Sequence, residues 1–440
     1  MATAVTSEAA DTSAPLVAVS WASRIRLIAL LICASASIVS ARYVVFVLVE
    51  PMRHDLGLND KQISAIKDLA FVIAYVFTAV PLGRLADRRS RRGLISIAAL
   101  LWGLASMVCG GARNFWMLML GRAGIGVGEA GFSSPAQSLI ADTFPPSQRG
   151  TAIAIFLLGA TLGNWIGPAF GGWAVQAHGW RWAYAAIGVP GLVLAPLIWF
   201  TLPDVRRGLS DGLVAARHAP APFLETARTL FATRSLVMLF LASSLFSLVT
   251  MGLVSWLPAF MSRTHHMSAA QAGLQMGGAL FFGTLIGHTS GGPMTDWLGR
   301  RDQRWYMWVP MLTGALAAAI GLVMLSGPSQ FVFPLLFLQF AVGGMSAAPM
   351  MAAVAALAPA SARGTAVAIL LVFINVIGFG LGPFLVATIS DLLHPVYGEA
   401  SLAIAMRWTL LVAVPGALFA WIGSRHFRAD EQAARVRLAA

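Results

Sequence analysis

The sequence predicts an all-α membrane protein of twelve transmembrane helices, arranged as two parallel repeats of six helices. The chain has 440 residues, of which 58% are hydrophobic and 11% charged, so a soluble fold would leave large apolar areas in water. Apolar runs of about 20 residues recur between polar breaks. The heptapeptide Arg149–Ile155 returns almost unchanged as Arg363–Ile369, and each copy opens a long apolar segment. This repetition indicates a duplicated bundle.

The apolar runs divide six plus six about a polar break. The first six helices are expected near 25–50, 62–83, 93–111, 114–141, 148–174 and 180–201. The second six are expected near 235–261, 269–292, 304–326, 330–358, 363–390 and 402–424. The first run is too long for a cleaved signal segment, so we expect it to span the membrane. Cys33 and Cys109 both fall inside apolar runs and predict no disulfide framework.

These helices divide the chain into five regions. They are a tail at 1–24, an N-terminal bundle at 25–201, a linker at 202–234, a C-terminal bundle at 235–424 and a tail at 425–440. Within the linker, the stretch from Pro222 to Phe231 has two interpretations that stay open. It is either a short amphipathic helix lying on the membrane surface or a flexible tether.

The net charge of +12 is distributed unevenly. Most of the 30 Lys and Arg residues lie in the termini and in the loops that share their side of the membrane. This asymmetry follows the positive-inside rule and predicts that both termini are cytoplasmic. A nucleic-acid-binding surface would need a basic patch interleaved with aromatic residues on a soluble domain, which the sequence lacks. We therefore expect anionic membrane lipids, and no nucleic acid, as neighbours of these residues.

Two short loops also repeat. Gly83, Asp87, Arg91 and Arg92 occupy the same relative places as Gly292, Asp296, Arg300 and Arg301. The twelve-helix plan and the decapeptide Gly83–Arg92 together resemble the major facilitator superfamily. In that family, the loop between helices two and three carries a glycine, an aspartate four residues later and paired basic residues. The resemblance implies that the loop meets the helix beginning near Arg363 and helps to hold the cytoplasmic side shut.

The residues of these loops suggest how such a contact would work. Gly83 is expected to let its helix end approach a neighbour closely, and Asp87 to lie against the positive N-terminal end of another helix. The alternative for the arginines is that they act only as topology signals. The candidate gating residues are Gly83, Asp87, Arg88, Arg92, Arg149, Asp296, Arg300 and Arg363.

Three ionisable side chains of the first half lie in mid-helix, namely Arg42, Arg122 and Glu129. Inserting each charged side chain at the bilayer centre would cost a free energy of roughly 2.5–3.5 kcal/mol. Such a cost is not expected in a helix whose role is purely structural. Arg122 and Glu129 share one helical face, so both can look into the same cavity. Gly124 and Gly128 form a GxxxG step for close helix approach. We expect Glu129 to carry a proton or face substrate; the alternative is a partner that only neutralises an arginine.

Three segments of the first half resemble the Spinster branch of that superfamily. They are Glu50–Gln62, Gly126–Ala130 and Ala141–Phe144 followed by Arg149. The resemblance implies transport of lysophospholipids or lysosphingolipids, as in animal members, and a location in the bacterial inner membrane. The family carries an Asp-Arg pair in helix one, where this chain has Ala41 and Arg42.

Ala41 changes the charge balance of the expected cavity. Glu129 alone faces Arg42 and Arg122, so one positive charge is in excess and an anionic substrate is favoured. We hypothesise that ionised Glu129 pairs with Arg42, and that protonation of Glu129 frees Arg42 for an acidic headgroup. The resemblance would make the missing acid part of a proton relay, so the substitution leaves coupling open.

Further binding candidates lie in both halves. Asn164 and Asn375 lie near glycine- and proline-rich bends, where each could contact substrate or serve as an interhelical hydrogen-bond partner. Phe282 is a third substrate-binding candidate, in an apolar lining that could equally face lipid. Other members of that lining would be Trp256, Phe281, Met345, Met350 and Met351. His288 is expected to be a packed neutral histidine; the alternative is a pH switch, for which the sequence identifies no partner.

These features predict a secondary active transporter that works by alternating access. We expect a monomer without cofactor or metal that moves an amphipathic anion, such as a lysolipid or sphingolipid, in a proton-linked manner. The sequence has no phosphate-binding loop, metal-ligand spacing or nucleophile with a base, so no enzyme is expected. One alternative is a proton-linked transporter of small organic anions or drugs. Another is a transport-dead membrane sensor or scaffold.

Overall fold

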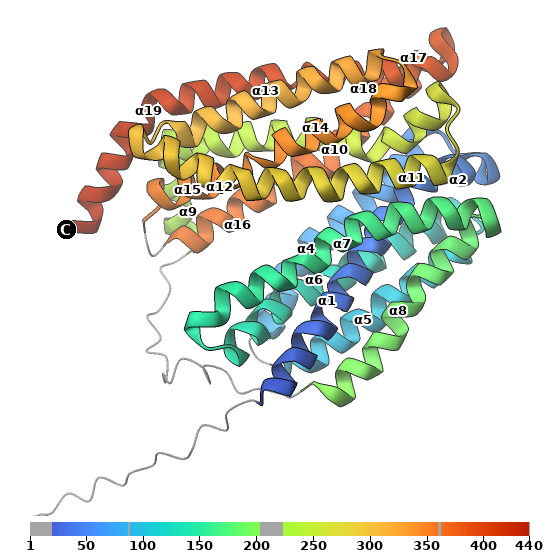
Figure 1. Ribbon diagram of the computed structural model, residues 1–440, viewed down its shortest axis with the longest axis horizontal. Coiled ribbons are helices and arrows are strands. Elements are labelled where there is room, and N and C mark those ends of the chain that lie inside the picture. The colour runs from blue at the N-terminus through green and yellow to red at the C-terminus, as the bar shows by residue number, and fades with distance from the viewer. Residues whose placement is uncertain (1–19, 87–88, 203–222, 360–361, 440) are drawn as a thin grey trace, which may run out of the picture.

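The computed structural model of the protein describes residues 20–86, 89–202, 223–359 and 362–439. Every regular element within these residues is a helix, and the helices form two bundles that lie side by side (Figure 1). The elements join end to end into twelve rods, six in each bundle. The predicted fold class is therefore confirmed.

The N-terminal bundle comprises α1 (Trp21–Tyr43) with η1 (Val44–Val47), α2 (Val49–Leu56), α3 (Asp60–Ser64) with η2 (Ala65–Ala70) and α4 (Phe71–Ala86), α5 (Arg91–Gly110), α6 (Phe115–Thr143), α7 (Pro146–His178) and α8 (Trp180–Thr201). The C-terminal bundle comprises α9 (Phe223–Ala232), α10 (Arg234–His265), α11 (Ala269–Gly278) with η3 (Ala279–Gly283) and α12 (Thr284–Arg301), α13 (Trp305–Ser326), η4 (Ser329–Phe331) with α14 (Val332–Gly344) and α15 (Ala347–Leu357), α16 (Arg363–Phe373) with η6 (Ile374–Leu381) and α17 (Gly382–Tyr397), and η7 (Gly398–Ala400) with α18 (Ser401–Leu410) and α19 (Ala413–Ala439).

Length and hydropathy identify nine candidate membrane spans in the described residues. One of them, 363–433, is 71 residues long and contains the last two rods. The two rods that do not qualify are α6 and the rod running from α11 to α12, which carry the charged or polar residues of helices four and eight. The twelve rods and the nine spans therefore describe the same architecture.

The second rod of each bundle begins in the same way. Asn59 and Gln62 form a capping box at the start of α3, and Ser268 and Gln271 form one at the start of α11. Each helix then runs into a π-helical segment, η2 or η3, where the regular hydrogen-bond ladder is interrupted. The duplication seen in the sequence thus extends to local backbone structure.

Glycines hold α1 close to α7. A Cβ added to Gly159, Gly163 or Gly167 would lie 2.6–2.7 Å from a backbone carbonyl oxygen of α1. Gly171 would meet Val44 of η1 at a similar 2.6 Å. This spacing of four residues allows the backbones to approach as far as sterics permit, as in other small-residue seams between membrane helices. These four glycines fix the position of α1, which carries Arg42, against α7.

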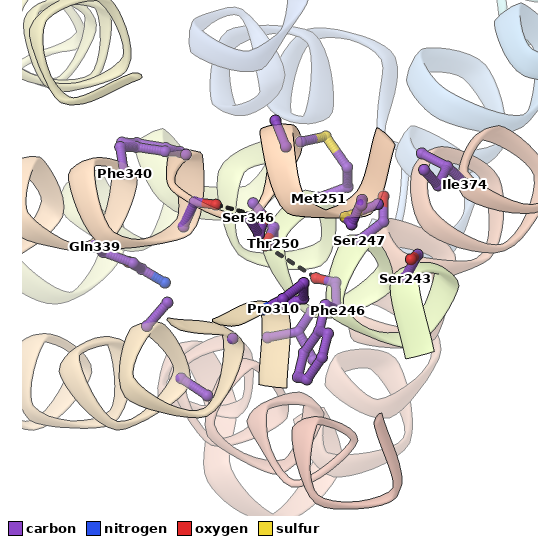
Figure 2. A pocket seen from close by; sticks show the side chains of 18 of the residues that line it. Ser243, Phe246, Ser247, Thr250, Met251, Pro310, Gln339, Phe340, Ser346 and Ile374 are labelled. Carbon is purple, nitrogen blue, oxygen red and sulfur yellow. Dashed lines mark hydrogen bonds between the residues drawn. The ribbon is translucent and has the colours of Figure 1, made fainter. Parts of the chain in front are cut away.

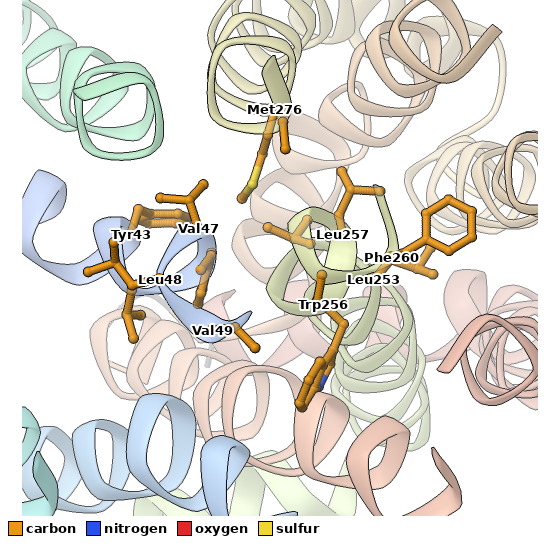
Figure 3. Close-up of a cluster of buried hydrophobic side chains, with 14 of the residues drawn as sticks. Tyr43, Val47, Leu48, Val49, Leu253, Trp256, Leu257, Phe260 and Met276 are labelled. Atoms are coloured by element: carbon orange, nitrogen blue, oxygen red, sulfur yellow. The ribbon is translucent and has the colours of Figure 1, made fainter. Parts of the chain in front are cut away.

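The bundles contact each other at one end of the molecule, here called the closed end, where α2, α11 and α17 lie (Figure 1). Buried side chains of both bundles pack there in one hydrophobic cluster. Figure 3 shows Val47 and Val49 of the N-terminal bundle beside Leu257 and Met276 of the C-terminal bundle. Close packing supplies this contact with dispersion energy over many atom pairs.

A polar network lies beside this cluster. Arg263 of α10 donates to Asp60 at 2.7 and 2.8 Å and to Glu50 at 2.7 Å, and its side chain is only 4% exposed. Asp391 of α17 accepts the backbone N–H of Lys61 at 2.9 Å. Charged residues of one bundle are therefore paired with residues of the other at the closed end.

The opposite end, here called the open end, carries the short loops that repeat in the sequence. A Cβ added to Gly83 would meet nothing within 4 Å. The close approach expected at Gly83 is therefore absent from this conformation, because the two bundles make their contacts at the closed end. Asp87 and Arg88 lie outside the described residues.

Two segments outside the spans are helical. α9 occupies the linker stretch for which two interpretations were open, and its Leu230 is fully buried beside Leu236 and Phe240. α19 continues to Ala439, so the stretch expected as a C-terminal tail from 425 is helical throughout its described residues. The stretch is rich in Ala and Arg, which are strong helix formers.

Candidate transport site

An ion pair joins α1 to α6 of the N-terminal bundle. Arg42 Nη1 donates to Glu129 Oε1 at 2.9 Å, and the two side chains are 14% and 11% exposed. Among the described residues, Arg42 Nη2 and Glu129 Oε2 are buried and make no hydrogen bond. The pair thus keeps an unused donor and an unused acceptor, which water, a proton or a ligand can engage.

Two aromatic rings cover the guanidinium of Arg42. Its Cζ lies 4.6 Å from the ring centre of Phe71 in α4 and 4.4 Å from that of Phe379 in η6. Both distances are within the range of cation–π attraction. Because Phe379 belongs to the C-terminal bundle, the ion pair lies where the bundles meet. Neither ring could be singled out from sequence, since aromatic residues are frequent throughout the spans.

Arg122 contacts backbone rather than a carboxylate. Its side chain is buried, and it donates to the carbonyl oxygens of Ala41 at 3.2 Å and Lys67 at 2.7 Å. These carbonyls lie near the end of α1 and in the π-helical η2, where helical hydrogen bonding is irregular. Arg122 and Glu129 both turn towards α1, as their spacing predicts. The guanidinium of Arg122 binds two helix segments at once.

We expect Arg122→Lys to lower the free energy of unfolding by about 1.5–3 kcal/mol, the range for hydrogen bonds to a charged group. An ammonium group has no planar fork with which to hold two carbonyls at once. Denaturant unfolding in mixed micelles measures the change. Arg92→Lys is the control, since Arg92 is only half-buried and donates to the single carbonyl of Leu202. Equal stability of the two variants would contradict the role assigned to Arg122.

A second buried ion pair was missed by the sequence analysis. Lys67 Nζ donates to Asp68 Oδ2 at 2.8 Å, and the two side chains are 0% and 5% exposed. The sequence predicts a helix over 62–83, which puts both residues in its first turns, where a charged side chain is unremarkable. The rod in fact begins at Asp60, so both residues lie more than a turn inside it.

The C-terminal bundle contains a pocket of about 300 Å³ among α10, α12, α13, α14 and η6 (Figure 2). Its walls are mainly apolar, with Phe246, Met251 and Phe340 among them. Polar side chains such as Ser243 and Gln339 interrupt this surface. Such a lining, apolar with a few polar groups, is typical of small-molecule sites.

Two expected lining residues, Met350 and Met351, do reach this pocket, and so does His288. His288 is exposed to it, so the expectation of a packed histidine is wrong. Phe281 and Phe282 lie elsewhere, against Trp165 of α7, with ring centres 5.7 and 6.5 Å from it. Trp256 is fully buried and donates to the carbonyl of Pro383.

The three remaining substrate-binding candidates are dispersed. Asn375 Nδ2 donates to Leu371 O of its own rod at 2.8 Å. Asn164 is half-buried and makes no side-chain hydrogen bond with a described residue. Phe282 is 49% exposed at the seam between α7 and η3. In the described residues, none of them has a polar or ring contact with Arg42.

The described gating candidates also lie apart. Arg92 donates to Leu202 O at 3.2 Å, and Arg149 is half-buried near the start of α7. Asp296, Arg300 and Arg363 are exposed, and no ion pair joins them within the described part of the chain. These residues lie at the open end of the molecule.

Comparisons with known proteins agree with this architecture. Residues 30–383 match the Major Facilitator Superfamily. An MFS-type efflux pump of Mycolicibacterium smegmatis is 32% identical over 396 residues, covering 88% of this chain and 90% of that protein. The sphingosine-1-phosphate transporter SPNS2 of Mus musculus is 26% identical over 417 residues, covering 88% of this chain and 75% of that protein.

A solved structure shares the fold. The bacterial homolog to the human lysosomal transporter Spinster, in an inward-facing and unoccupied conformation, matches with a TM-score of 0.87 at 24% identity. The match covers 94% of this chain and 99% of that one. The protein is thus a membrane transporter and not an enzyme. It belongs to the major facilitator superfamily, and Spinster-like proteins are among its relatives.

Proposed function

We propose that the protein moves an amphipathic anion, such as a lysolipid or sphingolipid, by alternating access linked to protons. The observation that carries this proposal is the Arg42–Glu129 pair, which is buried between the bundles with one donor and one acceptor unused. The pair and its buried neighbours comprise three cations and two carboxylates. The cations are Arg42, Arg122 and Lys67, and the carboxylates are Glu129 and Asp68. The excess positive charge favours an anionic headgroup.

The pair offers a way to link proton and substrate. Ionised Glu129 holds Arg42 at 2.9 Å, whereas a protonated Glu129 would compete less for the guanidinium. An acidic headgroup could then take the place of the carboxylate. Binding of the proton and of the substrate would each favour the other, which is thermodynamic coupling between two ligands.

The pocket of the C-terminal bundle fits the apolar part of such a substrate. Ile374 of η6 lines the pocket, and Phe379 of the same π-helical segment covers Arg42. A polar head at Arg42 and an apolar tail in the pocket would therefore be joined along η6. The volume of about 300 Å³ is at the lower end of the range for ligand sites.

The conformation also supports alternating access. The positive-inside distribution favours a cytoplasmic position for the open end, where α1 begins and α19 ends, and a periplasmic position for the closed end. Under this assignment the structure is closed towards the periplasm. Rocking of the two bundles would close the open end and separate the contacts of Arg263 with Asp60 and Glu50.

Ala318→Phe tests the tail site, because Ala318 lines the pocket and a ring there would fill much of it. We expect binding of a long-chain lysolipid in lipid nanodiscs to weaken at least about tenfold, through loss of apolar burial. Val323→Phe is the matched control, since Val323 lies on the same helix and is 59% exposed on its outer surface. Equal lysolipid affinity in both variants would count against the tail site.

A second candidate is a transporter of small organic anions or drugs, which the efflux-pump relative favours. Flux into proteoliposomes separates the two. Uptake of lysolipid that is lost in Ala318→Phe supports the first function, and uptake of small anions that Ala318→Phe leaves intact supports the second. Specific binding without flux at any pH would instead indicate a sensor or scaffold.

A further inference from the structure

Lys67 is the centre of a buried polar cluster that crosses between the bundles. Its Nζ donates to Asp68, to the carbonyl oxygen of Ser255 at 3.2 Å and to the Ser255 hydroxyl. The Ser255 hydroxyl in turn donates to Asp68 Oδ1 at 2.9 Å, and that of Ser64 donates to Asp68 Oδ2 at 2.9 Å. Ser64, Lys67, Asp68 and Ser255 are named here the Lys67 cluster.

The partners of Lys67 come from different bundles. Ser64 and Asp68 share its own rod, whereas Ser255 and Trp256 belong to α10. The Trp256 ring lies 4.4 Å from the ammonium nitrogen, and its position in the closed-end hydrophobic cluster is visible in Figure 3. A buried ammonium group is stable only while such partners replace its water. Separation of the bundles would remove Ser255 and Trp256 together.

The same residue reaches the central ion pair through its backbone. The carbonyl of Lys67 accepts Arg122 Nη2 at 2.7 Å, and Arg122 Nη1 donates to the carbonyl of Ala41. Ala41 directly precedes Arg42, which holds Glu129. Hydrogen bonds, connected covalently through the side chains of Lys67, Arg122 and Arg42, therefore link Ser255 of the C-terminal bundle to Glu129.

We propose that Lys67 is a positioning residue that stabilises the closed end through Ser255 and couples the separation of the bundles to the Arg42–Glu129 pair. The inference rests on alternating access as the proposed function. When the closed end opens, the Lys67 side chain exchanges Ser255 for water, and η2 is free to shift. Arg122 transmits that shift to the end of α1, because it holds both segments.

The first test measures the conformation alone. Spin labels at Trp116→Cys and Val396→Cys, both exposed beside the closed end, report opening of that end by pulsed electron resonance in nanodiscs. The background replaces Cys33 and Cys109. We expect Ser255→Ala to raise the ratio of open to closed populations at least about tenfold, since hydrogen bonds to two charged groups are lost. An unchanged ratio would overturn the proposal.

Ser244→Ala is the matched control. Ser244 is fully buried on the same helix, but its hydroxyl donates to Phe240 O within that helix. We expect its populations to equal those of the parent. A shift as large as that of Ser255→Ala would show that any buried hydroxyl of α10 has this effect, and would also overturn the proposal. The measurement needs neither substrate nor gradient, so its outcome is independent of whether lysolipid is transported.

The second test addresses coupling. Distant sites normally have additive effects on an equilibrium. If Lys67 links Ser255 to Glu129, the shifts caused by Ser255→Ala and Glu129→Gln should depart from additivity by more than about twofold in the population ratio. Additive shifts would show that Lys67 acts only locally at the closed end, and would overturn the proposed coupling to Glu129. Lys67→Arg, which keeps the charge, should leave a smaller shift than Lys67→Met, and equal shifts would exclude a role for the charge.

Discussion

Glu129→Gln should abolish the pH dependence of transport and reduce its rate at least about tenfold. A glutamine side chain still accepts a hydrogen bond from Arg42, so the local packing is kept. It cannot change charge, however, and Arg42 is no longer released by protonation. The measurement is uptake of labelled lysolipid into proteoliposomes between pH ~5.5 and pH ~8.

Asp55→Asn is the control for this experiment. Asp55 lies in α2, outside the spans, and accepts hydrogen bonds from Arg181 and from Trp180 within its own bundle. The bond from Arg181, followed by that from Trp180, lowers the pKa of Asp55, so the group stays ionised across the assay range. Its loss should leave the pH profile unchanged. A Glu129→Gln variant with the parent's profile would exclude Glu129 as the proton site.

The site residues that the sequence predicted are charged side chains in apolar surroundings. Arg42, Arg122 and Glu129 stand out because charged side chains in the middle of apolar spans need a partner. The pairing of Arg42 with Glu129 and the turn of Arg122 towards α1 follow from spacing on one helical face. The architecture could also be predicted, since the repeated heptapeptide and the lengths of the apolar runs indicate two bundles of membrane-spanning helices.

What sequence could not show depends on helix irregularity and on contacts between bundles. Lys67 and Asp68 looked like residues near a helix end, because the capping box at Asn59 starts the helix earlier than the apolar run does. The π-helical segments have no simple sequence signature, yet they set which way Lys67 and Phe379 face. Long-range contacts such as Lys67 with Ser255 join residues whose spacing carries no periodic signal.

Gly273→Ala should prevent the closed end from closing. A Cβ on Gly273 of α11 would lie 2.1 Å from the carbonyl oxygen of Pro168 in α7, and one on the facing Gly172 would lie 2.2 Å from that of Ala269. Both obstacles are backbone atoms, which cannot rotate away as a side chain does. The two helices, one from each bundle, must therefore separate to admit even a methyl group.

The expected result is a closed-end label distance, between positions 116 and 396, that stays long in most molecules, with transport reduced at least about tenfold. Alanine is a better helix former than glycine by about 1 kcal/mol, so α11 itself should not unfold. Gly278→Ala is the matched control on the same helix, because its Cβ would meet only the Phe333 ring at an ordinary 3.6 Å. If Gly273→Ala closes as readily as Gly278→Ala, contact between α7 and α11 does not limit closure. The balance between the two states would then depend on the polar contacts of Arg263 and Lys67.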